Sequence, residues 1–333
     1  MNDTQAIKDF YSKTFKFSYS SMNKLLFSPK LFYKDYILGE KEIRTDKHLV
    51  EGKLLHCLMF EPDKLEEKFK ILPEKTPSDN VRKVLYRLNE LSDLDQELLI
   101  DSDEWSSIIL EVLEDQNLYQ SLKKDEARLA KIQTKENELY WKFISNPNVD
   151  VVDTKTLEKC KNKLQYLLGN KDIQDIHISC NSKSDFELDP VSVYREKYLE
   201  CNLNDHLFGL KGYVDYYKID EENKTVTICD LKTTGKSISN FNETVDYYNY
   251  WLQAAIYSIL VYESHKDIIK DFEIIFKFIV IDTYNQVYSF KVSDDTYGDW
   301  MKSTADTFKI ADYHYTNQKY DLPFKFLINK VDL

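Results

Sequence analysis

The stretch GYVDYYKIDEENKTVTICDLKTT, residues 212–234, decides the fold class of this chain. Two runs of alternating aromatic, β-branched and polar residues flank a polar turn at residues 220–224. This pattern predicts two antiparallel strands joined as a β-hairpin. If Glu222 and Asn223 form the centre of the turn, the pairing register of the two strands is determined along their whole length.

This register brings two carboxylates and one ammonium group together. Asp215 lies directly opposite Asp230, and the Cβ atoms of such a pair are about 5 Å apart. Lys232 points to the same face as Asp230, because side-chain direction repeats every second residue along a strand. Two carboxylates at this distance repel each other unless a divalent cation lies between them, so the hairpin predicts a metal site.

A carboxylate pair with a neighbouring lysine suits the hydrolysis of a phosphodiester, which needs a metal ion and a cation near the attacking water. Asp215 and Asp230 would hold Mg²⁺, with Mn²⁺ as the alternative ion, and the backbone carbonyl of Leu231 would complete the coordination. Lys232 would position or activate the water. An Asp-x-Lys sequence is common, however, and the competing interpretation places Asp230 and Lys232 at an exposed strand end with Asp215 on the surface.

Further strands and helices surround the hairpin and indicate an α/β fold. Strands are expected in VSVYREKYLECNL, EIIFKFIVID and QVYSFKV, residues 191–203, 273–282 and 286–292. Helices are expected over about residues 246–263 and 294–310. The resulting core is a mixed central sheet flanked by helices.

The part of the chain before these strands is expected to be helical. A helix capped by Ser18, Ser20 or Ser21 is followed by a second helix that restarts at Ser28 and by a third over residues 51–60. Charged and apolar residues alternate at helical spacing from about residue 77 to 169. We therefore expect an N-terminal helical part of the core at 1–75, a helical insertion at 76–175 and the catalytic sheet and helices at 176–333.

Composition favours a cytoplasmic protein whose cysteines are reduced thiols. The five cysteines are scattered and form no Cys-x-x-Cys pair, so neither disulfides nor a zinc site are expected. The N-terminus lacks the apolar core of a signal peptide, and no apolar run is long enough to cross a membrane. The net charge of −12 argues against nonspecific binding of polyanions, unless the basic residues gather at one place.

Several motifs in order resemble the RecB-like and RecE-like (exonuclease VIII) branch of the PD-(D/E)XK nucleases. They are KGYVDYY, ICDLKTT and YWLQAAIY in the second half of the chain, preceded by SYSSMNKLLFSPKLFYKDYI and EGKLLHCLMFEP near the N-terminus. The similarity covers about residues 17–75 and 190–262. It implies the restriction-endonuclease-like core, a nuclease activity, and N-terminal helices that bring a histidine to the hairpin.

The resemblance also implies roles for individual residues. His56, four residues after a glycine, would be a metal ligand or an active-site histidine, although a buried structural histidine is the ordinary alternative. Gln253 and Tyr257 would form the helix motif beside the site. The family often has a further acid on the preceding strand, for which Glu196 is the first candidate and Glu200 the second. Both have the same strand parity, so periodicity cannot choose between them.

The family further implies a substrate and partners. By resemblance, the chain would degrade double-stranded DNA from an end, 5′ to 3′, for phage-type recombination in a bacterial host. It would act with a single-strand annealing protein and as a ring-shaped homo-oligomer. No cysteine follows Cys229, so no iron–sulfur cluster is expected, and no Walker A sequence is present, so no ATP is expected. The alternatives are an endonuclease or a helicase-associated nuclease, or a non-catalytic binding module such as a phage-encoded inhibitor.

Overall fold

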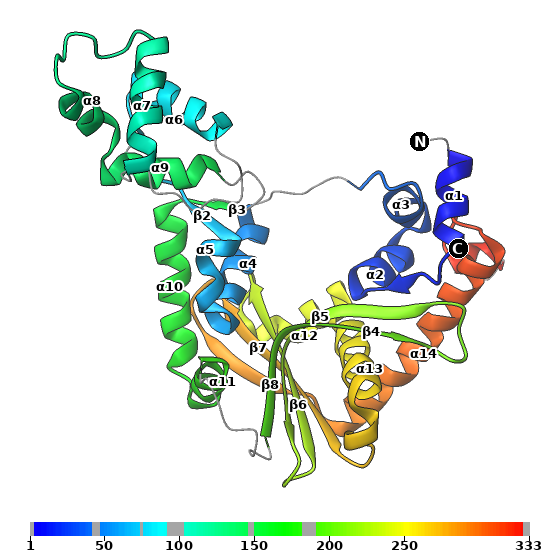
Figure 1. Ribbon diagram of the computed structural model, residues 1–333. Helices are drawn as coiled ribbons and strands as arrows, with labels where there is room; N and C mark the ends of the chain where they lie inside the picture. Colours follow the sequence, from blue (N-terminus) through cyan, green and yellow to red (C-terminus); the bar gives the residue numbers. More distant parts are fainter. Residues whose placement is uncertain are drawn as a thin grey trace. The chain divides into compact units, whose positions relative to one another are not determined.

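The computed structural model describes residues 3–41, 47–73, 76–91, 103–145, 150–181 and 191–328. The chain divides into two compact units, and Figure 1 labels the helices and strands of both. The first unit comprises Met1–Glu61 and Lys163–Leu333, and the second comprises Pro62–Asn162. Each unit has its own hydrophobic core.

A mixed sheet forms the centre of the first unit, as expected. Within the described residues it has six strands, in the order β1-β5-β6-β7-β8, with β4 paired to β5. The strands are β1 (Lys16–Phe17), β4 (Val191–Asn202), β5 (Gly209–Asp220), β6 (Thr225–Thr234), β7 (Glu273–Asp282) and β8 (Val287–Lys291). β1 runs parallel to β5 and β6 runs parallel to β7, whereas the other pairs are antiparallel.

The parallel pair β6–β7 requires a crossover connection, which consists of two helices rather than one. α12 (Phe241–Tyr248) and α13 (Tyr250–Ile269) replace the single helix expected over about residues 246–263, so that expectation was wrong at Asn249. The backbone of Asn249 is left-handed, with φ of 55°, and this conformation ends α12. The following helix, α14 (Asp294–Asn317), extends beyond the expected end at residue 310.

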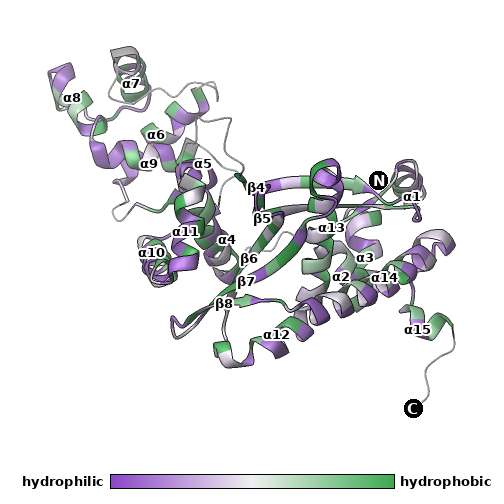
Figure 2. Ribbon diagram, turned by 90° about the horizontal axis from the view of Figure 1, so that it is seen from below, coloured by the Kyte–Doolittle hydropathy of each residue, from purple (hydrophilic) through white to green (hydrophobic). Residues whose placement is uncertain are grey.

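The two faces of the sheet are covered by different helices. Phe276 and Phe278 of β7 belong to the larger core cluster, to which α13, α14 and α2 (Tyr19–Phe27) also contribute. Ile279 and Ile281 point to the opposite face and pack with α4 (Lys47–Phe60) and α11 (Lys171–Asn181). Figure 2 shows a long hydrophobic stretch in β7, as expected for a strand that is covered on both faces.

The arm formed by β4 and β5 changes the face that it buries. Tyr194 and Tyr217 stack in the larger cluster with ring centroids 4.4 Å apart. Further along the arm Leu199 and Val214 belong to that cluster instead, although they have the opposite strand parity. The change occurs at Glu196, whose φ of 43° interrupts the regular alternation of β4.

β5 and β6 form a fork. They pair from Asp220 and Thr225 at the turn only as far as Tyr216 and Cys229. Beyond this point β5 stays paired with β4, while β6 stays paired with β7. Among the described residues, no strand lies beside residues 211–215 of β5 on the side that faces β6.

Short helices precede the sheet in the first unit. They are α1 (Asp3–Tyr11), α2 (Tyr19–Phe27), α3 (Pro29–Phe32), the π-helical turn η1 (Tyr33–Ile37) and α4 (Lys47–Phe60). Ser18 caps α2, because its hydroxyl accepts from the Ser21 N–H while the Ser21 hydroxyl accepts from the Ser18 N–H. The structure thus selects Ser18 from the three serines that the sequence left open.

The second unit consists mainly of helices. Its elements are η2 (Pro62–Lys64), α5 (Leu65–Lys68), β2 (Phe69–Ile71), α6 (Asp79–Leu91), α7 (Asp103–Asp115), α8 (Asp125–Ile132), α9 (Lys135–Ser145), β3 (Asp150–Val152) and the first part of α10 (Thr154–Leu168). β2 pairs with β3 within this unit. The second unit therefore begins at Pro62, whereas the sequence placed the start of the helical insertion at residue 76. The remaining elements of the first unit are η3 (Ile238–Asn240), which precedes α12 in the β6–β7 crossover, and α15 (Phe324–Leu327) after α14. In the described part of the chain, no helix is long and apolar enough to cross a bilayer.

Replacement of Ser18 by alanine removes the N-cap of α2, and we expect it to lower the free energy of unfolding by about 1 kcal/mol. The measurement is urea denaturation followed by circular dichroism. Ser20→Ala is the matched control, because Ser20 is exposed in the same first turn and does not cap the helix. Equal losses in the two variants would contradict the role of the Ser18 hydroxyl.

Candidate metal centre

The candidate site lies where β5 and β6 separate. The paired residues of the two strands have the register expected from the sequence, and it places Asp215 opposite Asp230 just beyond the last pair, Tyr216 and Cys229. Asp215 does not complete the ladder with its backbone. Its side-chain Oδ2 accepts a hydrogen bond of 2.9 Å from the Leu231 N–H, so a carboxylate takes the place of a strand partner.

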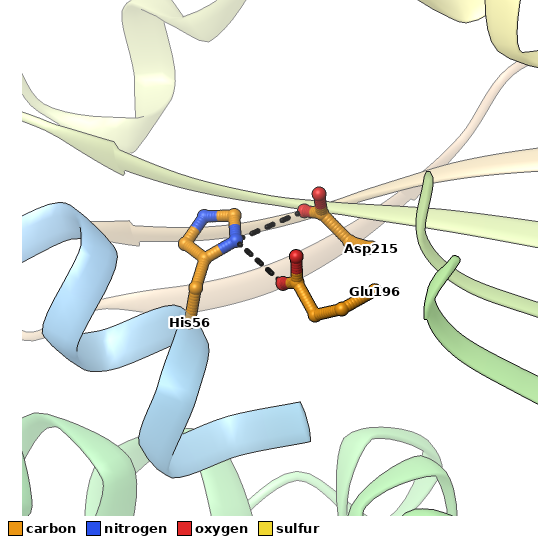
Figure 3. A group of neighbouring side chains, drawn as sticks. All are labelled: His56, Glu196 and Asp215. Atoms are coloured by element: carbon orange, nitrogen blue, oxygen red, sulfur yellow. Dashed lines mark ion pairs between the residues drawn. The ribbon is translucent and has the colours of Figure 1, made fainter. Parts of the chain in front are cut away.

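His56 reaches the backbone of the same residue, Leu231, from α4. Its Nε2 lies 2.9 Å from the Leu231 carbonyl oxygen, which can only accept, so Nε2 carries the hydrogen. Its Nδ1 faces two carboxylates, 3.3 Å from Asp215 Oδ2 and 3.6 Å from Glu196 Oε1 (Figure 3). In the neutral ring, Nδ1 therefore presents a lone pair to the space between these oxygens, where either a proton or a metal ion fits.

Glu196, and not Glu200, is the acid of β4 that joins the cluster. By the pairing of its neighbours, Glu196 lies opposite Asp215. Glu200 is instead at the surface, where it accepts a hydrogen bond from Tyr198 and forms an ion pair with Lys16. Strand parity could not separate the two acids, because both have the same parity. The left-handed backbone at Glu196 breaks the regular alternation of β4, so the two side chains nevertheless differ in their surroundings.

The other half of the site joins β6 to α13. Lys232 Nζ lies 2.6 Å from Asp230 Oδ2 and donates to Gln253 Oε1 at 2.8 Å. Gln253 Nε2 lies 2.8 Å from Asp230 Oδ1 and 2.9 Å from the Tyr257 hydroxyl. Gln253 and Tyr257 share one helix face because they are four residues apart. The ring of Tyr250 adds a cation–π contact, with Lys232 Nζ 4.5 Å from its centroid.

The charged groups of the site shift one another's pKa values. Burial lowers the pKa of His56, but the carboxylates of Asp215 and Glu196 outweigh burial and raise this pKa to about 9. Burial raises the pKa of Asp230 to about 6, against the attraction of Lys232. Burial also raises the pKa of Asp215, against the attraction of His56. The pKa of Lys232 is raised, because Asp230 and Asp215 outweigh the effect of its burial, so Lys232 is an ammonium ion at neutral pH.

A divalent cation fits this set of donors. Nδ1 of His56 and one oxygen each of Glu196 and Asp215 all lie within 4.8 Å of one another. Asp230 Oδ2 is compensated by the Lys232 ammonium, but among the described residues the buried Glu196 Oε1 has no hydrogen-bond donor. Carboxylate oxygens are suitable ligands for Mg²⁺ or Mn²⁺, and an imidazole nitrogen is a ligand of transition metals. A buried acceptor without a donor is costly, and a cation would satisfy it.

The predicted site residues are therefore brought together, in two subsets. His56, Glu196 and Asp215 form the cluster with metal-ligand spacing. Asp230 lies outside that cluster and contacts Lys232 and Gln253 instead. The Leu231 carbonyl, which the sequence assigned to the metal, receives the hydrogen of His56.

The sequence did not assign a role to Tyr250. It lies on the same helix face as Gln253 and Tyr257, and an aromatic residue at that spacing usually belongs to the core. Its contact with Lys232 depends on the position of α13 against β6, which no local sequence signal determines.

Comparison with known proteins identifies a family for this chain. The sequence pattern of the PD-(D/E)XK nuclease superfamily matches residues 16–282. No protein of curated function matches the chain in sequence. A crystal structure of a "Putative exonuclease" from Eubacterium rectale superposes with a TM-score of 0.46 and 10% identity, over 97% of this chain and 85% of that chain. A likeness this distant carries no argument about function.

We expect the binding of Mg²⁺ or Mn²⁺ to strengthen as the pH rises towards 9, because the pKa of His56 is raised to about 9 and its Nδ1 must lose a proton before it can bind a metal. Calorimetric titration at neutral pH, in buffers of different ionisation enthalpy, should show the release of about one proton per ion bound.

His56→Ala should weaken metal binding and abolish most of this proton release. His48→Ala is the control, because His48 is an exposed histidine on the same helix, α4. An unchanged proton release in His56→Ala would show that His56 is not a ligand of the metal.

Proposed function

The chain belongs to the PD-(D/E)XK nuclease superfamily, and from this we propose that it is a metal-dependent deoxyribonuclease that hydrolyses linear double-stranded DNA from its ends. One observation carries the proposal. Three groups with metal-ligand spacing, His56, Glu196 and Asp215, share the fork of β5 and β6 with the ammonium group of Lys232. Within this cluster the buried Glu196 Oε1 has no hydrogen-bond donor among the described residues, and a cluster that served only to stabilise the fold would not need such an acceptor.

The residues of the site have separable tasks in this proposal. A bound divalent ion would polarise the phosphoryl oxygen and lower the pKa of water. Lys232 lies beside the site as a cation that orients the attacking water and stabilises the charge that develops on the phosphate. Gln253 holds both Lys232 and Asp230, so it is a positioning residue.

The mode of attack rests on the family resemblance of the motifs. That resemblance supports degradation from a DNA end, in the 5′ to 3′ direction, to leave a single strand for an annealing protein. It also supports a ring-shaped homo-oligomer, in which basic groups need only line the channel of an acidic chain.

We expect Mg²⁺ to be required for the shortening of linear duplex DNA labelled at its 5′ or 3′ ends, and EDTA to stop it. Asp230→Asn and Lys232→Ala should each lower the rate by about 100-fold or more, because each removes an electrostatic contribution to the transition state. The measurement is gel electrophoresis of the labelled products over time.

Lys236→Ala is the matched control and should retain full activity, since the side chain of Lys236 is 60% exposed and lies beyond the end of β6. Nicking of closed circular DNA would show that the protein is an endonuclease and not an exonuclease. Retained DNA binding with no metal-dependent cleavage would identify a non-catalytic module instead.

A further inference from the structure

A cavity of about 700 Å³ opens beside Lys232 and Gln253. We call it the tyrosine groove, because six of its lining residues are tyrosines: Tyr19, Tyr198, Tyr213, Tyr248, Tyr250 and Tyr257. Its walls are the first turn of α2, the β4–β5 arm and the junction of α12 with α13. Its volume lies within the range of about 300–1,000 Å³ that is usual for ligand pockets.

The charge of the tyrosine groove is opposite to that of the chain. The chain has 57 acidic and 45 basic residues, yet the described residues that line the groove include two lysines and no aspartate or glutamate. Lys232 lies at the end next to the metal cluster, and Lys211 lies on β5. An acid-free surface with two ammonium groups suits a ligand that carries phosphates.

Two tyrosine rings are exposed in the groove on a fixed support. Tyr198 and Tyr213 are a directly opposed pair of β4 and β5, with ring centroids 5.2 Å apart, and they are 42% and 60% exposed. Their neighbours Leu199 and Val214 are buried in the core, so the other face of the arm is packed. Exposed aromatic rings beside basic groups are the usual platform for unpaired nucleic-acid bases.

The opposite wall of the groove is also held in place. Asn23 of α2 donates to the Tyr248 carbonyl at 3.2 Å and accepts from Asn249 at 2.7 Å. The Tyr19 hydroxyl donates to the same Tyr248 carbonyl. These bonds join α2 to the junction of α12 and α13, so both walls of the groove exist before a ligand binds.

We propose that the tyrosine groove binds unpaired nucleotides of the strand that is cut, with their bases stacked on Tyr213 and Tyr198 and a phosphate beside Lys211. This inference rests on the proposed function, because the groove opens at Lys232 and Gln253 next to the metal cluster. A base inside a duplex is stacked on both faces and cannot lie on a tyrosine ring. The substrate class is therefore a single-stranded or opened DNA end, and a blunt duplex must open at its end before it is cut.

The test measures binding separately from cleavage. Fluorescence anisotropy compares a labelled single-stranded oligothymidylate with an oligomer of equal length made of abasic sites. It uses the wild-type protein in EDTA and, in a second series, Asp230→Asn with Mg²⁺. We expect the base-bearing strand to bind about 10- to 100-fold more tightly in both series, as stacking of one or two bases on aromatic rings provides.

Tyr213→Leu should remove most of this preference for bases, while Tyr213→Phe should retain it because the ring remains. Tyr288→Leu is the matched control. Tyr288 is likewise a strand residue, on β8, is 56% exposed, and has an aromatic neighbour, Phe290, at 4.7 Å. Thermal melting of each variant checks that the fold is intact.

Equal binding of the two oligomers, or equal losses in Tyr213→Leu and Tyr288→Leu, would overturn the inference. If DNA cleavage still required Mg²⁺ in that case, the proposed nuclease would stand without the stacking site. Conversely, the protein could prefer bases in a way that depends on Tyr213 and yet cut no DNA. This outcome would support base binding in the tyrosine groove and contradict the proposed nuclease activity.

Discussion

The backbone N–H and C=O of Leu231 are hydrogen-bonded by side chains instead of by the neighbouring strand β5. The N–H donates to Asp215, and the carbonyl accepts from His56. Buried backbone groups without partners would cost free energy, so the separation of β5 and β6 requires such substitutes. Because Asp215 comes from β5 and His56 from α4, this requirement joins three elements at one point. The second ring nitrogen of His56, Nδ1, is then directed at Asp215 Oδ2 and at Glu196 Oε1.

The hairpin and its register could be predicted because they depend on local signals. The polar turn determines which residues of the two strands are opposite, and the period of a strand places Lys232 with Asp230. His56 had no such signal, since a histidine in an apolar helix is ordinarily structural. Only the family resemblance indicated it, and its position depends on how α4 packs against the sheet.

Other features were not predictable because they depend on single backbone conformations or on distant segments. The left-handed backbone at Glu196 changes which face of the β4–β5 arm is buried, and the left-handed backbone at Asn249 divides one expected helix into two. Glu196 carried no warning of positive φ, whereas Asn249 is of a type that adopts it more often than other non-glycine residues, a signal that the apolar pattern around it outweighed. The tyrosine groove is assembled from α2, the β4–β5 arm and the start of α13, which lie far apart in the chain. Patterns within one element cannot reveal such a surface.

The described residues that line the tyrosine groove include no aspartate or glutamate, and this has a consequence for the effect of ionic strength. Affinity for a single strand falls with added salt according to the number of phosphates neutralised, with a slope of about −0.7 per phosphate on logarithmic axes. Two lysines line the groove, so a strand bound there releases few counterions, while contacts between bases and tyrosine rings are nearly independent of salt. The acidic surface elsewhere repels other parts of the DNA, and this repulsion is itself screened by salt. A strand in this groove is therefore held mainly by its bases, and its affinity changes far less with ionic strength than that of proteins that bind the DNA backbone.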